Sequence, residues 1–133
     1  MKTFEHPFRI YYEDTDAGGV VYHPNYLNFM ARTRTEWLRS LPNFFENLRA
    51  QKILTPVKAV EIEYHAPAFL DDEIIVRMYL KSFKPVSALF FHEVYRYNTD
   101  ILLCTATIKI ACVDQDLKLC RWPDYNAMLE LLK

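Results

Sequence analysis

The only two glycines in this chain of 133 residues are adjacent, at Gly18 and Gly19. Glycine tolerates positive φ and permits the close approach of a ligand or another backbone, so a chain without glycine elsewhere uses this pair for a local purpose. The surrounding segment also contains Asp14, Asp16 and His23. Acids, a histidine and a flexible backbone together indicate a functional site more than a plain turn.

The composition is typical of a globular protein without a polyanionic partner. Hydrophobic residues make up 51% of the chain and aromatic residues 15%, which is enough for a substantial core. The length and the absence of repeats or linkers predict one domain over residues 1–133. The formal net charge of −1 does not provide the concentrated basic surface that nucleic acids and anionic membranes attract, so we expect neither as a partner.

Location and cysteine chemistry are predicted from what the sequence lacks. No stretch resembles a signal peptide or approaches the roughly 20 apolar residues that cross a bilayer, so we expect a cytoplasmic protein without a transmembrane segment. The three cysteines lack C-x-x-C spacing and a nearby histidine pair. We therefore expect reduced structural thiols at Cys104, Cys112 and Cys120.

A strand and a long helix are predicted on either side of the glycine pair. Residues 8–12 are rich in aromatic and β-branched side chains, which favours a strand. Pro24 suits the first turn of a helix, and Pro42 ends it. Between them the apolar positions recur at helical spacing: Tyr26, Phe29, Met30, Thr33, Trp37 and Leu41. The opposite, polar face is predicted to carry Asn28, Arg32, Arg34, Glu36 and Arg39.

From Val57 onward the hydrophobic period changes from helical to alternating, which predicts four strands in succession. These strands cover roughly residues 57–64, 73–81, 89–97 and 104–112. Proline and Asn-Thr-Asp breaks separate them, and residues 124–132 predict a short C-terminal helix. One early strand, one long helix and four consecutive strands describe an α+β domain, with an antiparallel sheet covered on one face by a helix.

Asp16 and His23 are the leading candidates for chemistry because they flank the glycine turn. His23 directly precedes Pro24, so its backbone N–H is expected at the start of the helix. The unpaired N–H groups and partial positive charge there suit a carbonyl oxygen that becomes an oxyanion. A nearby carboxylate can act as general base or nucleophile. Equally, Asp14, Thr15 or Asp16 can serve only to cap the turn or helix through side-chain hydrogen bonds.

A metal site is a weaker alternative. Asp14 and Asp16 have the D-x-D spacing of some metal and phosphoryl-transfer sites, with His23 as a further candidate ligand. The residues before them do not form a buried apolar strand and no β-α alternation follows, so we expect no metal. The remaining histidines are predicted to be structural or to lie at the surface: His6, His65 and His92.

The segment around the glycine pair resembles a known signature. Residues 12–16 (Tyr-Glu-Asp-Thr-Asp), 19–23 (Gly-Val-Val-Tyr-His) and 25–26 (Asn-Tyr) are similar to the motif of the 4-hydroxybenzoyl-CoA thioesterase family of hotdog-fold enzymes. The similarity is greatest to the YbgC-type branch, the acyl-CoA thioesterases associated with the Tol-Pal system. It covers nearly the whole chain, because it continues through residues 32–38, 71–72 and 111–114.

The resemblance implies a hotdog fold, in which a curved five-stranded antiparallel sheet wraps around one long helix, here residues 26–41. It also implies a homodimer or homotetramer with active sites at the subunit interface. The implied reaction is hydrolysis of an acyl-CoA thioester to a free acid and coenzyme A. Coenzyme A is part of the substrate, and no metal or bound cofactor is expected.

The resemblance also assigns roles to individual residues. Asp16 matches the catalytic carboxylate, which attacks the thioester carbonyl or activates a water, and the sequence leaves both routes open. The His23 N–H is expected to bind the thioester oxygen, and its side chain to orient water or assist thiol departure. Gly19 and Tyr22 are expected to lie against the substrate. Tyr12 matches a further tyrosine of the branch, but packing in the core is an equally good interpretation.

Other side chains have weaker functional interpretations. Glu13 is expected to be a turn carboxylate, and Arg32 and Glu36 to form a surface pair one helical turn apart. Aromatic residues of the strand region either shape an acyl pocket or simply form core: Phe83, Phe90, Phe91, Tyr95 and Tyr97. Basic residues of the same region are candidates for contacts with the coenzyme A phosphates: Arg77, Lys81, Lys84 and Arg96.

Two alternatives to acyl-CoA hydrolysis remain open. A related hotdog enzyme can act on acyl groups carried by acyl carrier protein, which requires a basic docking surface. A non-catalytic protein of the phospholipid-synthesis or cell-envelope machinery binds acyl-CoA without turnover. The joint presence of Asp16, Gly19 and His23 favours an enzyme over this second alternative.

Overall fold

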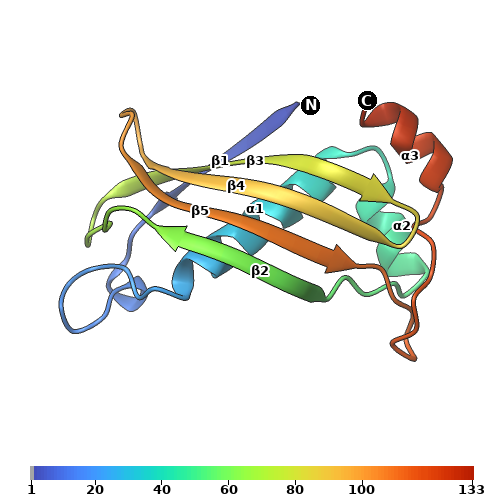
Figure 1. The fold of residues 1–133 in the computed structure, drawn as a ribbon, viewed down its shortest axis with the longest axis horizontal. Helices are drawn as coiled ribbons and strands as arrows, with labels where there is room; N and C mark the ends of the chain where they lie inside the picture. The colour runs from blue at the N-terminus through green and yellow to red at the C-terminus, as the bar shows by residue number, and fades with distance from the viewer. Residues whose placement is uncertain (1) are drawn as a thin grey trace.

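The computed structural model describes residues 2–133, and its centre is a five-stranded antiparallel sheet (Figure 1). The strands are β1 (Thr3–Arg9), β2 (Val57–Tyr64), β3 (Glu73–Lys84), β4 (Ser87–Arg96) and β5 (Leu102–Ala111). Their order across the sheet is β1-β3-β4-β5-β2, so β1 and β2 form its two edges. The four strands that follow residue 57 agree with the alternating sequence pattern.

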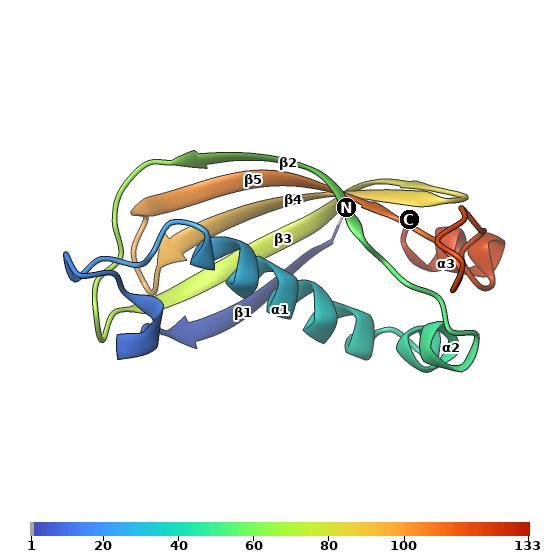
Figure 2. The same cartoon turned by 90° about the horizontal axis from the view of Figure 1, so that it is seen from below.

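Helix α1 (Asn25–Ser40) lies along one face of this sheet, as Figure 2 shows. It begins one residue after Pro24 and ends before Pro42, as predicted. The side chains that it buries against the sheet are Tyr26, Phe29, Met30 and Thr33. The ring of Phe29 lies 5.0 Å from the ring of Phe8 in β1. The predicted arrangement of one long helix on one face of an antiparallel sheet is therefore confirmed.

The alternation within each strand separates the core from the open face of the sheet. In β3 the buried side chains are Ile74, Val76, Met78 and Leu80. Successive side chains of a strand point to opposite faces, so these four lie on the α1 side and the residues between them on the other. The same alternation in β4 and β5 completes a continuous apolar layer beneath α1.

Two short helices, α2 (Phe44–Ala50) and α3 (Tyr125–Leu131), lie at the same end of the sheet but apart from one another (Figures 1 and 2). Helix α3 agrees with the predicted C-terminal helix. Helix α2 was not predicted, because only Phe44 and Leu48 bury a side chain within its single apolar stripe. No helix within residues 2–133 combines the length and the apolar character needed to cross a membrane.

The first strand lies earlier in the chain than predicted. Strand β1 pairs with β3 from Thr3 opposite Tyr79 to Arg9 opposite Glu73. A 3-10 turn, η1 (Tyr12–Asp14), takes the place of the predicted end of the strand. The Tyr11 N–H donates to Asp14 Oδ2 at 2.8 Å, and such a local side-chain acceptor competes with strand pairing. The predicted strand over residues 8–12 is therefore wrong in its second half.

The polar face of α1 differs from the prediction in two respects. Arg34 is half-buried against the sheet instead of facing solvent, and its Nη1 lies 3.3 Å from Nε2 of His92 in β4. Its long apolar stem allows a charged head to sit at such a position. Glu36 forms its ion pair with Arg39, so the predicted Arg32–Glu36 pair is wrong. Side chains three or four positions apart are neighbours on a helix surface, and Glu36 pairs with the residue three positions later.

Candidate functional site

The glycine pair closes a tight hairpin turn in front of α1. The Asp16 N–H donates to the Val20 carbonyl at 2.9 Å, and the Gly19 N–H donates to the Asp16 carbonyl at 3.0 Å. Gly19 has a φ of +85°, in the left-handed region that favours glycine. Three-residue hairpin loops commonly end in a residue of this conformation. The backbone of the turn therefore explains why glycine occupies position 19.

The Asp16 carboxylate is held by one oxygen and has its other oxygen free. Its Oδ1 accepts the Gly18 N–H at 2.8 Å, which is the predicted capping interaction within a turn. Its Oδ2 has no hydrogen-bond partner among residues 2–133, and the side chain is exposed. A Cβ atom on Gly18 would lie 3.2 Å from Oδ1, so Gly18 leaves room for the carboxylate. The free oxygen is available to a water or a substrate atom.

Asp14, by contrast, has a structural role. It is buried, and its Oδ2 and Oδ1 accept hydrogen bonds of 2.8 Å from the Tyr11 N–H and from Nδ2 of Asn25. Its carbonyl accepts the Tyr22 N–H at 2.9 Å. These bonds fasten the turn to the first residue of α1 and confirm the capping interpretation for Asp14. Both carboxylate oxygens of Asp14 therefore hold the turn, whereas Asp16 uses only one of its oxygens in this way.

Within the described part of the chain, no three His, Cys, Asp or Glu side chains are grouped so that they could hold a metal ion.

His23 lies two residues before the first residue of α1 and next to Pro24, as the sequence predicts. Pro24 already has helical φ and ψ of −73° and −13°, and Asn25 is the first residue of the helix. The His23 N–H has no acceptor among residues 2–133. It lies at the end of α1 where the unpaired N–H groups and the helix dipole produce a partial positive charge. The backbone at this position is therefore an available donor for an oxygen that carries negative charge.

Aromatic side chains surround the His23 ring and connect it to β2. The Tyr22 and Tyr64 rings lie edge-on at centroid distances of 5.1 and 6.1 Å from the His23 ring. The Tyr64 hydroxyl donates to the His23 carbonyl at 2.9 Å. No sequence signal identified Tyr64, because it lies 41 residues further along the chain and reads as an ordinary strand aromatic.

A shallow cavity of about 300 Å³ lies beside this aromatic group at the start of α1. Its lining consists of Val21, His23, Tyr26, Tyr64, His65, Ala66 and Pro67. Burial raises the pKa of the Tyr26 hydroxyl, which accepts the Ala68 N–H at 3.3 Å. Asp16 is not part of this lining, since it lies on the hairpin turn. The structure therefore brings Tyr22, His23 and Tyr64 together at the start of α1. The turn that carries Asp16 comes earlier in the chain.

Tyr12 is not brought to this cavity within one protomer. Its side chain is 82% exposed, so the interpretation that it packs in the core is wrong. Its carbonyl accepts hydrogen bonds from the Thr15 N–H and hydroxyl, which makes its backbone part of the turn. The exposed ring remains available to a partner or a ligand.

The basic candidates of the strand region are partly neutralised. Arg77 forms an ion pair with Glu5, and Arg96 lies 3.5 Å from a carboxylate oxygen of Asp72. Arg96 also donates to the Pro67 carbonyl at 2.9 Å, beside the shallow cavity. Lys81 and Lys84 are exposed. Of the four candidates, Arg96 is therefore the one that the structure connects to the cavity.

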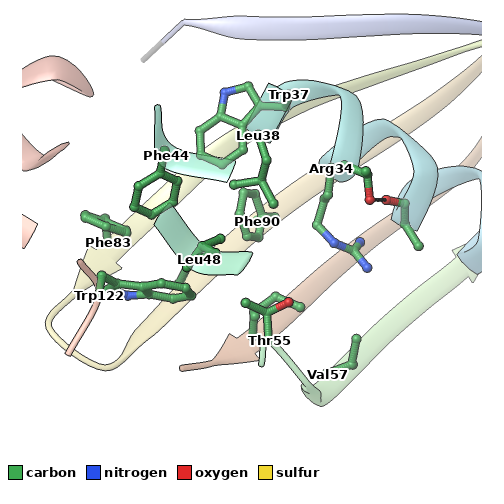
Figure 3. Close-up of a pocket in the computed structure, with 14 residues that line it drawn as sticks. Arg34, Trp37, Leu38, Phe44, Leu48, Thr55, Val57, Phe83, Phe90 and Trp122 are labelled. Carbon is green, nitrogen blue, oxygen red and sulfur yellow. Dashed lines mark hydrogen bonds between the residues drawn. The ribbon is translucent and has the colours of Figure 1, made fainter. Parts of the chain in front are cut away.

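The aromatic candidates separate onto the two faces of the sheet. Phe83 and Phe90 line a second cavity of about 280 Å³ between α1, α2 and the sheet (Figure 3). Phe91 and Tyr95 alternate with the buried residues of β4 and lie on the open face. Tyr97 is exposed. Phe83 and Phe90 therefore belong both to the core and to the wall of this cavity. Phe91, Tyr95 and Tyr97 belong to neither.

The remaining histidines and the cysteines have the predicted structural or surface positions. His65 is exposed, His6 is half-buried and His92 is fully buried. Desolvation, and next the positive charge of Arg34, lower the pKa of His92 to about 3. The three cysteines are free thiols, with 3.8 Å between Sγ of Cys112 and Sγ of Cys120.

A turn that carries a carboxylate leads into a long helix on one face of an antiparallel sheet, which is an α+β architecture. Residues 11–130 match the family described as the thioesterase-like superfamily, and the chain belongs to this family. A solved structure of a 4-hydroxybenzoyl CoA thioesterase mutant, complexed with 4-hydroxybenzoyl CoA, superposes with a TM-score of 0.85. It is 21% identical, and the superposition covers 100% of both chains. At that identity the likeness concerns the fold alone, and the predicted hotdog fold is confirmed.

Two relatives place the chain more narrowly within this superfamily. It is 47% identical to the acyl-CoA thioesterase YbgC of Haemophilus influenzae over 113 residues, which are 84% of this chain and 81% of the relative. It is 40% identical to the acyl-CoA thioester hydrolase YbgC of Escherichia coli O6:H1 over 111 residues, which are 84% of this chain and 82% of the relative. The chain is a member of the YbgC type, and the resemblance stated from the sequence is confirmed.

Proposed function

We propose that this YbgC-type thioesterase hydrolyses acyl-CoA thioesters with the Asp16 carboxylate and the His23 backbone N–H as its catalytic groups. The observation that carries the proposal is a carboxylate with one free oxygen and an N–H without an acceptor, both in the segment before α1. Gly19 and Tyr22 lie against the substrate in this proposal. Tyr12 is exposed and contacts the substrate only in the assembled protein.

The His23 N–H polarises the thioester carbonyl. When the carbonyl carbon becomes tetrahedral, negative charge develops on the oxygen, and a donor already aimed at that position stabilises it. The partial positive charge at the start of α1 acts in the same direction. Because the Tyr64 hydroxyl holds the His23 carbonyl, the orientation of this part of the backbone is defined by β2 as well as by the helix.

Asp16 acts by one of two routes, both of which use its free Oδ2. As a general base it removes a proton from a water whose oxygen attacks the carbonyl carbon, and the proton passes to the sulfur as the C–S bond breaks. As a nucleophile it forms a C–O bond to the carbonyl carbon while the C–S bond breaks, and water then hydrolyses the resulting anhydride. The His23 imidazole orients the water or protonates the departing thiolate.

A second copy of the chain completes the site in this proposal, and β2 is the edge at which it pairs. Val57, Val60 and Tyr64 of β2 are 49%, 38% and 46% exposed, which is unfavourable for large apolar side chains at a bare edge. The other edge, β1, contains Pro7, which has no N–H to donate to a neighbouring strand. Tyr64 contacts His23, so pairing at β2 places the site at the interface.

The proposed homodimer joins two sheets through their β2 strands, and a homotetramer joins two such dimers. A two-fold axis perpendicular to the sheet makes the two β2 strands antiparallel and keeps both α1 helices on the same face. The proposed reaction takes place in the cytoplasm and uses no metal or bound cofactor. Cell fractionation tests the location.

Thiol release from a panel of acyl-CoAs tests the catalytic assignment. We expect Asp16→Asn to lower hydrolysis by at least about a hundredfold, with unchanged circular dichroism and oligomeric state. Glu13→Gln, which alters the exposed neighbouring acid, is the matched control and should retain activity. An active Asp16→Asn variant would contradict the assignment. If the wild type hydrolyses no acyl-CoA, an acyl group on a carrier protein or a binding role becomes the better interpretation.

Single-turnover hydrolysis in ¹⁸O-labelled water separates the two routes for Asp16. The nucleophilic route places the label first in the Asp16 carboxylate, because water can attack the anhydride at the aspartyl carbon. The general-base route places it directly in the product acid, and mass spectrometry of the peptide that contains Asp16 distinguishes them.

A further inference from the structure

The cavity between α1, α2 and the sheet has one charged group in an otherwise largely apolar wall. Among the residues that line it, only Arg34 carries a charge, while Trp37, Phe44 and Trp122 contribute aromatic surface. Figure 3 shows the Arg34 guanidinium extending from α1 into the space between the helix and the strands. The cavity volume of about 280 Å³ lies near the lower end of the roughly 300–1,000 Å³ of small-ligand pockets, so it suits a short chain.

The Arg34 guanidinium has no counter-charge within the described residues. Its polar neighbour is His92, with Nη1 3.3 Å from Nε2. His92 is neutral, because burial lowers its pKa to about 3. No carboxylate among residues 2–133 forms an ion pair with Arg34. Burial lowers the pKa of Arg34 to about 10, so it stays charged at neutral pH, and a partly buried cation without a partner is costly.

The two ends of β2 relate this cavity to the proposed catalytic site. Val57, at the start of β2, lines the cavity, and Tyr64, at its end, contacts His23. Antiparallel pairing of two β2 edges brings the Val57 end of one strand beside the Tyr64 end of the other. The cavity of one protomer then lies next to the partner's His23. Within one protomer the cavity is distant from His23, since the rise along α1 from Asn25, near His23, to Arg34 in the cavity wall is about 14 Å.

We propose that this cavity binds the distal end of the acyl group whose thioester lies at the partner's His23, and that Arg34 selects acyl groups that end in a carboxylate. The inference rests on the proposed function and adds a substrate class to it. A terminal carboxylate supplies the missing counter-charge and fits the guanidinium with two parallel hydrogen bonds. The aromatic wall packs against the methylene groups between the carboxylate and the thioester.

Pairs of acyl-CoAs that differ only at the distal end test this selection. The pairs are hexanoyl-CoA with adipyl-CoA and octanoyl-CoA with suberyl-CoA, and the measured quantity is the ratio of kcat/KM within each pair. The wild type should prefer the carboxylate-ended member of at least one pair. Arg34→Met should lower that ratio at least about tenfold, as expected when hydrogen bonds to a charged group are lost.

Two further variants control for changes of folding and of general surface charge. Arg34→Lys keeps the positive charge without the planar fork, so it should retain part of the preference. Arg32→Met removes an exposed arginine two positions earlier on the same helix and should leave the ratio at the wild-type value. Because the quantity compared is a ratio within one variant, a lower fraction of folded enzyme does not affect it.

A mixed dimer of Asp16→Asn and Arg34→Met protomers tests whether the cavity serves the partner. The only catalytic Asp16 in this dimer belongs to the Arg34→Met protomer. If the acyl group enters the partner's cavity, this site uses an intact Arg34, and the preference for the carboxylate-ended substrate returns toward the wild-type ratio. A ratio equal to that of the Arg34→Met homodimer overturns the proposal that the cavity acts on the partner's substrate.

The outcomes separate failure of the inference from failure of the proposed function. Equal hydrolysis of both members of each pair by the wild type, or a ratio unchanged in Arg34→Met, overturns carboxylate selection while thioester hydrolysis stands. Absence of hydrolysis of all four substrates overturns the inference, and absence of hydrolysis across the whole acyl-CoA panel contradicts the proposed function as well. An Arg34→Met variant that becomes monomeric in the ultracentrifuge points to an ion pair between Arg34 and a carboxylate of the other protomer, and it overturns the inference that the cation awaits a substrate carboxylate.

Discussion

The Tyr64 hydroxyl donates a hydrogen bond of 2.9 Å to the His23 carbonyl, and this contact joins an edge strand to the residue that precedes α1. Tyr64 belongs to β2, whose other backbone edge is unpaired in the single chain. A partner strand that pairs with β2 therefore also helps to fix the position of the backbone that carries the His23 N–H. Assembly and catalysis are coupled through one side chain in the proposed dimer.

We expect Val60→Glu to give monomers with little activity. Val60 is 38% exposed and lies opposite the buried Ile108, so its side chain is on the α1 side of β2. When two β2 edges pair, each introduced carboxylate would face either the other carboxylate or an apolar side chain of the partner strand, and both are unfavourable. Sedimentation velocity should report the monomer mass, and thiol release should fall by about a hundredfold because the interface geometry is lost. Glu61→Gln on the opposite face is the control, and a fully active monomer would contradict the interface site.

The two glycines should respond differently to alanine. Gly19→Ala places a side chain at a φ of +85° without any steric contact, since no atom lies within 4 Å. It should lower the free energy of unfolding by about 1–2 kcal/mol, measured by urea denaturation. Gly18→Ala has no such backbone strain but brings a Cβ to 3.2 Å from Asp16 Oδ1, so it should mainly lower kcat. Equal effects of the two variants on stability would tell against this separation.

Asp14→Asn should destabilise the fold. The amide cannot accept from both the Tyr11 N–H and the Asn25 side chain, and one of its own N–H groups faces a donor. Leaving a buried donor unsatisfied should lower the free energy of unfolding by about 1–3 kcal/mol. Thermal and urea unfolding measure the change, with Glu13→Gln as an exposed control expected within about 0.5 kcal/mol of the wild type. Wild-type stability in Asp14→Asn would mean that the turn does not depend on this carboxylate.

His92 should make stability depend on pH in the acid range. Its pKa is about 3 in the folded protein against an ordinary 6.5, because burial and then Arg34 disfavour the charged ring. Between these values the unfolded chain binds a proton that the folded protein does not. The contribution is therefore complete above the unfolded pKa and is lost as the pH falls, by about 1.4 kcal/mol per pH unit.

Urea unfolding of the wild type and of His92→Gln at several pH values between about 4 and 7 tests this linkage. The glutamine variant lacks the titrating ring, so its free energy of unfolding should decline less toward acid pH. Parallel pH profiles for the two proteins would show that His92 is not held neutral in the folded state.

Most of the fold was predictable because it is encoded over short distances. The alternation from Ile74 to Leu80 predicts a strand with one buried face, and the apolar spacing from Tyr26 to Trp37 predicts a helix that lies on a sheet. The turn was also predictable, since only glycine is suited to the φ of +85° at position 19. The start of the first strand was not, because β1 is defined by its pairing with β3 some seventy residues away.

The sequence by itself determined the helix, the strands after residue 57, the glycine turn and the candidate pair of Asp16 and His23. Each of these depends on residues within a few positions of one another. Only the tertiary structure decided that Tyr64 reaches His23 and that Arg34 lies beside His92 in the wall of a cavity. These contacts join residues 41 and 58 positions apart, so they follow from how the sheet packs on α1 and not from any local pattern.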